Sequence, residues 1–290
     1  MDSGALVQLA LEALSCSQKE LATHLNVSPT QISKWKKGEH MSHDMEKKLR
    51  AISNIGDRIP SFVLEAGSLE AAVKWERLIH YLAERANEYA ETGYDTPPLR
   101  DDIDFLCWDT FHVLKEMGVA LPHEFPKELD RDYERDESGS AESAVNLRET
   151  IDQNPYSSLI YKIYQSMTDV YGFYAAYVSE LINDDNLDLF DTPAEDFESC
   201  LLSLAASKVE VDPEFAPNKH KFTLGIEKDY EEWITIVKDK AFRAGIPLKA
   251  ELLDLVNEDN DVLAVEAEEE SSGINASRVH PDIYMDELLT

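Results

Sequence analysis

The chain has little of what marks secreted and membrane-spanning proteins. Its 290 residues include three cysteines, Cys16, Cys107 and Cys200, which lie far apart and form no CxxC pair. An odd number of isolated cysteines argues against a disulfide framework and favours a reducing, cytoplasmic setting. No apolar run approaches the roughly 20 residues that a membrane helix needs, and residues 6–14 are too short and too polar for a signal peptide. We therefore expect a cytoplasmic protein that spans no membrane.

Positive charge is also scarce, with 27 Lys and Arg residues against 58 Asp and Glu residues and a formal net charge of -31. A surface of this charge repels phosphate, which excludes a protein that coats nucleic acid over its whole surface. The charge is unevenly spread. Residues 1–60 hold eight basic and seven acidic residues, whereas the remainder holds 19 basic and 51 acidic residues. The net charges of +1 and -32 indicate two segments with different partners.

The apolar content of 43% is enough for real cores, and apolar residues recur with a helical period almost throughout. We predict an all-α fold with three parts: an N-terminal domain of residues 1–60, a larger acidic helical domain of residues 61–265, and an acidic tail of residues 266–290. In the tail, residues 266–275 are expected to be disordered, and residues 280–289 fit either a short amphipathic helix or a frayed terminus.

Two helix starts near the N-terminus carry explicit capping signals. Residues 17–20 (Ser-Gln-Lys-Glu) form a capping box, and residues 28–31 (Ser-Pro-Thr-Gln) form a second one with proline at the first helical position. The first helix is expected to end near Leu25, and Gly38 provides the stop of the second. Two short helices joined by a tight connection are therefore predicted between residues 17 and 38.

The apolar residues of these helices have the spacing of a helix-turn-helix core. They are Leu21, Ala22, Leu25, Val27, Ile32 and Trp35. Together with Gln18 at the helix start and Gly38 at the end, the segment SQKELATHLNVSPTQISKWKKG resembles the lambda-repressor-like (Cro/CI, XRE) helix-turn-helix family. The resemblance covers about residues 3–56, with flanking helices near residues 3–14 and 42–55.

The resemblance implies binding of double-stranded DNA through residues 17–38, with the second motif helix in the major groove. The positions that face the bases in this family correspond to Ser28, Pro29, Thr30, Ser33 and Lys34. Of these, Lys34 is the strongest candidate for guanine recognition. Its phosphate-contacting positions carry over to Gln18, Lys36 and Lys37. Such proteins usually dimerise across a palindromic site, so a homodimer is expected.

The sequence thus predicts a DNA-binding transcription regulator with a helical effector and oligomerisation domain. Two other interpretations stay open. The helix-turn-helix could serve only packing or dimerisation, or the protein could resemble an antitoxin whose acidic residues 61–290 sequester a basic protein partner.

Signals of enzymatic chemistry are thin. The sequence contains no HExxH, GxSxG, P-loop or dinucleotide-binding glycine pattern, and its eight histidines show no paired Cys/His spacing. Acidic stretches from Asp184 and from Asn257 have part of a calcium-loop spacing but lack the glycine at position six. We expect no enzyme, no cofactor and no metal site.

Beyond residue 60 the periodicity predicts a series of helices and one solvated loop. Helices are expected over residues 69–92, 101–117, 156–182, 192–207, 226–242 and 248–256, and a loop over residues 122–142. The stripe of Tyr161, Tyr164, Tyr171, Tyr174 and Tyr177 predicts a bundle core or a dimer seam, with an aromatic ligand box as the alternative.

Overall fold

A computed structural model of the chain describes residues 2–274, and the regular secondary structure in this range is all helical. The predicted all-α class is therefore confirmed for these residues. The α-helices are α1 (Ser3–Ala13), α2 (Gln18–Leu25), α3 (Pro29–Lys36), α4 (His43–Ser53), α5 (Pro60–Glu65), α6 (Leu69–Glu88), α7 (Ile103–Glu116), α8 (Tyr133–Ser138), α9 (Ala141–Gln153), α10 (Pro155–Tyr177), α11 (Ser179–Ile182), α12 (Leu201–Lys208), α13 (Lys219–Ala244), α14 (Asp254–Asn257) and α15 (Asn260–Ser271). The short 3-10 helices are η1 (Pro97–Leu99), η2 (Lys127–Leu129), η3 (Asp185–Leu187) and η4 (Pro193–Asp196).

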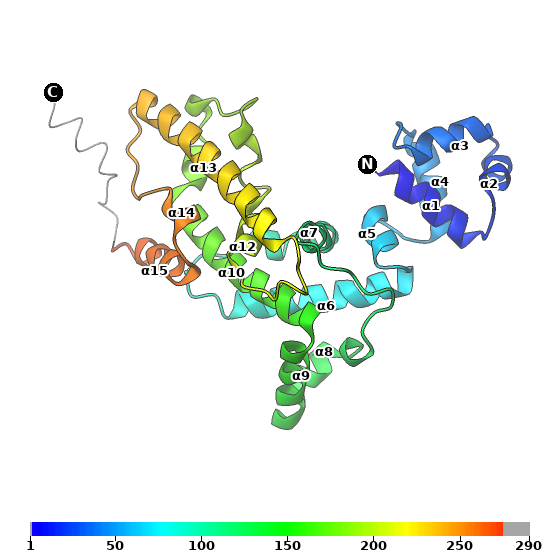
Figure 1. Ribbon diagram of the computed structural model, residues 1–290, viewed down its shortest axis with the longest axis horizontal. Helices are drawn as coiled ribbons and strands as arrows, with labels where there is room; N and C mark the ends of the chain where they lie inside the picture. The colour runs from blue at the N-terminus through cyan, green and yellow to red at the C-terminus, as the bar shows by residue number, and fades with distance from the viewer. Residues whose placement is uncertain (1, 275–290) are drawn as a thin grey trace.

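The helices form two groups, shown in Figure 1. The N-terminal group consists of α1–α4 and lies at one end of the molecule, and the large group consists of α6–α15. Helix α6 extends from beneath α5 along the large group, and α8 and α9 project from its lower side. The molecule is therefore elongated, with the N-terminal group at one extremity.

Local capping explains where α2 and α3 begin. The Ser17 hydroxyl accepts from the Glu20 N–H at 3.4 Å and the Glu20 carboxylate accepts from the Ser17 N–H at 2.8 Å, which completes the predicted capping box. At α3, the Ser28 hydroxyl accepts from the Gln31 N–H at 3.2 Å. Asn26 follows α2 with a φ of 54°, a left-handed conformation that ends the helix and turns the chain into α3. The predicted starts of both helices are confirmed.

Helix α1 holds the far end of α3 in place. The buried Ser3 hydroxyl makes hydrogen bonds of 3.0 Å with the carbonyl oxygens of Trp35 and Glu39. Next to it, a Cβ at Gly4 would lie 3.0 Å from the Lys36 carbonyl oxygen, so glycine allows the two helices to approach closely. The direction of α3 therefore depends on a contact with residues more than 30 positions earlier in the chain.

Helix α5 joins the two groups through packed side chains. Phe62 is fully buried, and its ring meets Phe111 of α7 edge to face at 4.9 Å. Just before α5, Arg58 pairs with Glu76 of α6 at 2.7 Å. The apolar cores of the two groups are continuous through this joint. The predicted boundary at residue 60 therefore coincides with the first residue of a packed helix and not with an open linker.

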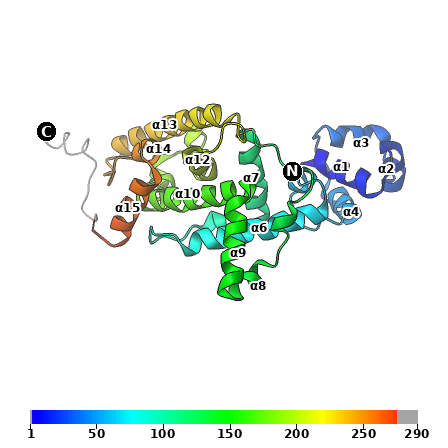
Figure 2. The ribbon, with the colours of Figure 1, turned by 60° about the horizontal axis from the view of Figure 1, so that its bottom comes forward.

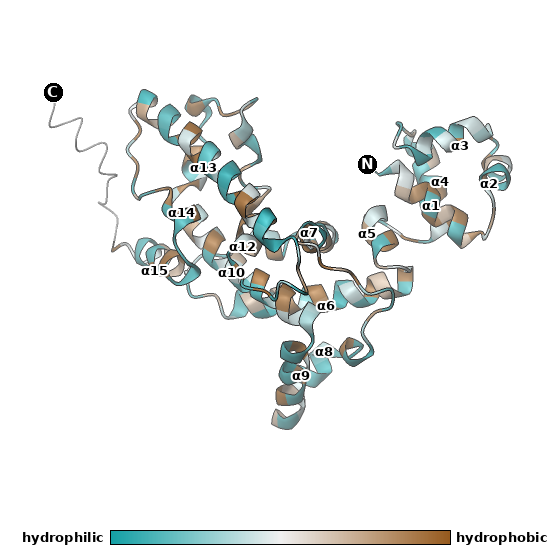
Figure 3. Ribbon diagram, in the orientation of Figure 1, coloured by the Kyte–Doolittle hydropathy of each residue, from teal (hydrophilic) through white to brown (hydrophobic). Residues whose placement is uncertain are grey.

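The large group is built around α10. Figure 2 shows α13, α12, α10 and α6 stacked on one another, and Figure 3 shows hydrophobic residues on both α10 and α6. Most positions of α10 are buried, with Lys162 and Gln165 among the few that are exposed, and the helix packs against α6, α9, α12 and α15. Four of the five stripe tyrosines, Tyr161, Tyr164, Tyr174 and Tyr177, are buried there. The stripe therefore forms a bundle core and not an open aromatic box.

The predicted solvated loop over residues 122–142 is wrong. This segment contains η2 and α8, and it buries Phe125, Leu129 and Tyr133 against the rest of the protein. The abundance of acidic residues and prolines concealed these three widely spaced apolar anchors. The helix predicted over residues 192–207 begins later than expected, because the Thr192 hydroxyl donates to the Leu189 carbonyl oxygen and does not cap a helix, and α12 begins only at Leu201.

The C-terminal region is more ordered than predicted. The boundary at residue 265 falls inside α15, which Asp259 caps by accepting from the Val262 N–H at 3.1 Å. Leu263 and Ala267 of α15 are buried, which explains why the acidic run continues as helix up to Ser271. The predicted helix over residues 248–256 is replaced by the short α14. The short helix predicted over residues 280–289 lies outside the described residues.

Candidate nucleic-acid interface

The exposed side of α3 brings together four of the predicted contact residues. Ile32 and Trp35 are buried, which anchors one side of the helix in the core of the N-terminal group. On the opposite side, the positions i, i+3, i+4 and i+7 of a helix share one stripe. The stripe consists of Thr30, Ser33, Lys34 and Lys37, of which Ser33 is half-buried and the others are exposed. The exposed stripe is polar and carries two ammonium groups.

The remaining predicted base-facing and α3 phosphate residues lie outside this stripe. Ser28 is exposed at the N-cap, where its oxygen accepts from the Gln31 N–H and its own O–H is left to donate. Pro29 and Lys36 are both exposed, but the helical period places them toward the side of Ile32. The structure therefore separates Pro29 and Lys36 from the stripe, although all these residues stay on or beside α3.

Gln18 is the first residue of α2 and is half-buried, at a helix end whose free N–H groups attract anions. The Glu20 carboxylate already occupies this end. Hydrogen bonds from Ser17 lower the pKa of Glu20, so its negative charge persists at neutral pH. An exposed carboxylate here weakens the attraction that the start of α2 has for a phosphate.

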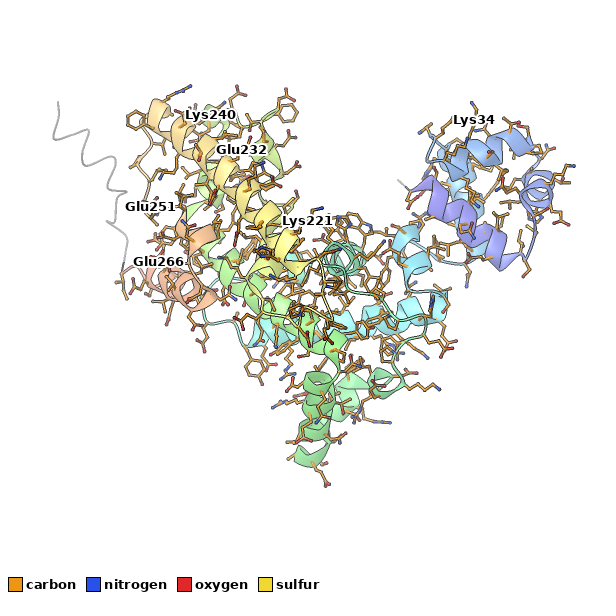
Figure 4. All side chains as sticks on the ribbon, viewed as in Figure 1. Lys34, Lys221, Glu232, Lys240, Glu251 and Glu266 are labelled. Carbon is orange, nitrogen blue, oxygen red and sulfur yellow. The ribbon has the colours of Figure 1, made fainter. Side chains whose placement is uncertain are left out.

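Lys34 has one acidic neighbour within the protein. Its Nζ lies 3.5 Å from Glu39 Oε2, and the two side chains are 51% and 53% exposed. Such an exposed pair contributes little to stability and is easily exchanged for another anion. Figure 4 shows Lys34 on the N-terminal group, while Lys221, Glu232 and Lys240 lie along α13 on the other group of helices. The large group therefore leaves Lys34 accessible.

Two residues that shape this surface were not predicted from the sequence. Ser3 fixes the C-terminal end of α3, and Glu39 pairs with Lys34. Ser3 gives no local signal, because its partners are more than 30 residues away in the chain. Glu39 lies only five residues after Lys34, and the proximity of opposite charges around Gly38 was a signal that could have identified it.

Burial raises the pKa of two carboxyl groups in the large group, and neither makes a hydrogen bond or ion pair with the residues described. Burial raises the pKa of Asp109 on α7 to about 6. Burial, followed by the nearby charges of Asp261 and Glu91, raises the pKa of Asp169 on α10 to about 7. Within residues 2–274 no group of three or more His, Cys, Asp or Glu residues could hold a metal ion. In the same range, no helix is long and apolar enough to cross a membrane.

The raised pKa of Asp169 predicts that Asp169→Asn stabilises the protein at high pH. A carboxyl group whose pKa is higher in the folded state destabilises that state once pH exceeds the unfolded value near 4, and the penalty is complete above about pH 7. We expect a gain on the order of 2 kcal/mol in unfolding free energy at pH 8, which shrinks steadily toward pH 5. Urea unfolding at several pH values measures it, with the exposed Asp152→Asn as control. A gain that does not change with pH would contradict the assignment.

Comparisons with known proteins do not assign the chain to a family. Searches against protein-family models, the curated proteins and the solved structures give no match. The functional assignment therefore depends on the residues and geometry described above.

Proposed function

We propose that the protein is a cytoplasmic, sequence-specific DNA-binding transcription regulator of the Cro/CI type. In this proposal α2 and α3 are the helix-turn-helix, and α3 enters the major groove of double-stranded DNA. The observation that carries it is the exposed stripe of Thr30, Ser33, Lys34 and Lys37, on a helix whose two ends are fixed by Ser28 and Ser3. A polar, cationic and rigidly held helix face has the chemistry needed to contact base edges and phosphates.

The proposal assigns the large group an effector and dimerisation role and no enzymatic one. A single α3 reaches few phosphates, so useful affinity requires two copies on a palindromic site. The charge of residues 61–290 also restricts the DNA contact to the N-terminal group, because the acidic surface repels phosphate elsewhere.

Selection from a random DNA library with the intact protein tests this function. We expect enrichment of a palindromic motif that is lost in the triple variant Lys34→Ala, Lys36→Ala, Lys37→Ala. The matched control is Lys127→Ala, Lys221→Ala, Lys228→Ala, which removes three exposed lysines from the large group and should keep the motif. Selections at two salt concentrations separate specific binding from general attraction to phosphate. Absence of any enriched sequence at both concentrations would overturn the proposal.

Removing the acidic neighbour of Lys34 should tighten DNA binding. Glu39→Gln frees the Lys34 ammonium and removes a negative charge close to the proposed DNA surface. We expect a gain of about 0.5–1 kcal/mol in binding free energy, with little change in stability because the pair is exposed. Fluorescence anisotropy with the selected site measures the gain, and Glu12→Gln on α1 serves as an exposed acidic control. Weaker binding of Glu39→Gln would mean that Glu39 positions Lys34 and does not compete for it.

A further inference from the structure

A groove with a volume of about 470 Å³ lies in the large group, where η1 and α7 meet η4, α12 and the middle of α10. Its floor is apolar, because Leu106, Met167 and Leu202 line it and are buried. Phe105 forms part of its wall and is 44% exposed. The groove therefore offers an apolar surface that the described residues do not cover.

All charged side chains that line this groove are acidic, and most have partners within the protein. Asp102 caps α7 by accepting from the Phe105 N–H at 2.9 Å, and Glu198 accepts from the Tyr174 hydroxyl at 2.8 Å. Asp101 lies 3.3 Å from Arg100, and Glu195 accepts from the Asp191 N–H at 3.2 Å. These four carboxylates have structural explanations that require no ligand.

Asp109 is the exception. It lines the groove, is half-buried, and has no hydrogen-bond or ion-pair partner in the part of the chain that the structure describes. His112, one turn later on α7, stabilises its charge weakly, and Glu116 opposes it. Keeping a carboxylate partly desolvated and unpaired costs stability, and groups of this kind are concentrated at binding sites. The side chain is therefore positioned to pair with a cation that enters the groove.

We propose that this groove binds a small organic cation, an ammonium or guanidinium group carried on an aromatic or aliphatic body. The positive group pairs with Asp109, and the body packs on Leu106, Met167 and Leu202. Phe105 closes one side, where its ring attracts a cation through its π face. The volume of the groove lies in the range of small-molecule sites, and the acidic rim complements only positive charge. This site is independent of the proposed DNA surface and goes beyond it.

Calorimetric titration of the full-length protein at pH 8 tests the site with two defined probes, 2-phenylethylamine and its uncharged analogue 2-phenylethanol. We expect saturable binding of the amine with one site per chain, at least about tenfold tighter than the alcohol, because a charge-assisted hydrogen bond to Asp109 contributes only for the amine. Equal binding of the two probes, or no binding of the amine, would overturn the proposal.

Variants then locate the site. Asp109→Asn should weaken amine binding by at least about tenfold and leave alcohol binding unchanged. Asp152→Asn, an exposed aspartate on α9, is the matched control and should bind like the wild type. Because Asp109→Asn removes an unpaired charge, its melting temperature should not fall, so a loss of binding cannot be attributed to unfolding. Phe105→Ala is a second test. It should weaken the binding of both probes, since it removes a wall of the groove. Unchanged amine binding by Asp109→Asn would refute the assignment.

Discussion

Lys34→Ala will lower the affinity for the selected DNA site by about 1–3 kcal/mol and relax the base preference at one position of each half-site. Lys34 lies in the middle of the exposed stripe of α3, where a long cationic side chain can meet the O6 and N7 atoms of guanine. Loss of this contact affects the correct site more than any other DNA. Anisotropy titrations with the selected site and with single-base variants of it measure the change.

Lys37→Ala provides the contrast. Lys37 is at the C-cap of α3, where the chain would leave the major groove of the DNA, so its partner should be a phosphate. We expect its removal to weaken binding to all sequences alike and to reduce the slope of log affinity against log salt by about 1 for each half-site. Lys221→Ala on α13 serves as the control and should change neither quantity. If Lys34→Ala and Lys37→Ala weakened every sequence equally, Lys34 would be a phosphate contact and its proposed role would be wrong.

Trp75→Ala will cause the largest loss of stability among the substitutions considered, about 3–5 kcal/mol of unfolding free energy. Trp75 of α6 is fully buried, and its ring makes edge-to-face contacts with Phe111 at 5.4 Å, Phe125 at 5.0 Å and Tyr156 at 6.2 Å. These rings come from separate segments, so the truncation leaves a cavity that several elements line. Urea unfolding followed by far-UV circular dichroism measures the loss.

Trp75→Phe is the matched variant. The indole Nε1 of Trp75 has no hydrogen-bond acceptor among residues 2–274, and a buried unsatisfied donor is unfavourable. Phenylalanine keeps an aromatic ring in the cluster and removes this donor, so the expected loss is at most about 1.5 kcal/mol. A loss for Trp75→Phe as large as that for Trp75→Ala would show that Nε1 makes a stabilising contact.

The same aromatic cluster connects the proposed DNA surface to the large group. Phe111 touches both Trp75 and Phe62, and Phe62 belongs to α5, which packs against α1. Helix α1 in turn holds α3 through Ser3. Packed side chains therefore fix the orientation of α3 relative to the large group. Two copies joined through their large groups would therefore present two α3 helices at a defined separation, as a palindromic site requires.

Prediction succeeded where the signal was local. The capping box at Ser17 and the N-cap at Ser28 act within four residues, and they placed the starts of α2 and α3 correctly, although the reciprocal Gln31 bond expected at Ser28 is not formed. Prediction failed where a segment is stabilised from outside. The polar composition of residues 122–142 concealed Tyr133, which stacks on Tyr81 of α6, and the acidic run after residue 265 concealed Ala267, which is buried on α15 where this helix packs against α10.

The candidate site divides in the same way. The contact residues on α3 were named from the resemblance to the Cro/CI family, and the sequence pattern also predicted that Trp35 faces inward. The contacts that hold α3 could not be predicted from the sequence, since Ser3 and Gly4 show their role only when α1 lies against α3. The groove beside Asp109 could not be predicted either, because its walls come from η1, α7, α10, η4 and α12.

By itself, then, the sequence determined the helical class, the contrast in charge between residues 1–60 and the remainder, and the limits of the two helices that carry the candidate DNA contacts. These properties depend on composition and on interactions between residues within one or two turns of a helix. The tertiary structure alone decided how α5 joins the two groups, how far α15 continues, and which carboxylate of the groove has no partner among the residues described. Each of these depends on side chains that meet from positions tens of residues apart, where no local pattern records the contact.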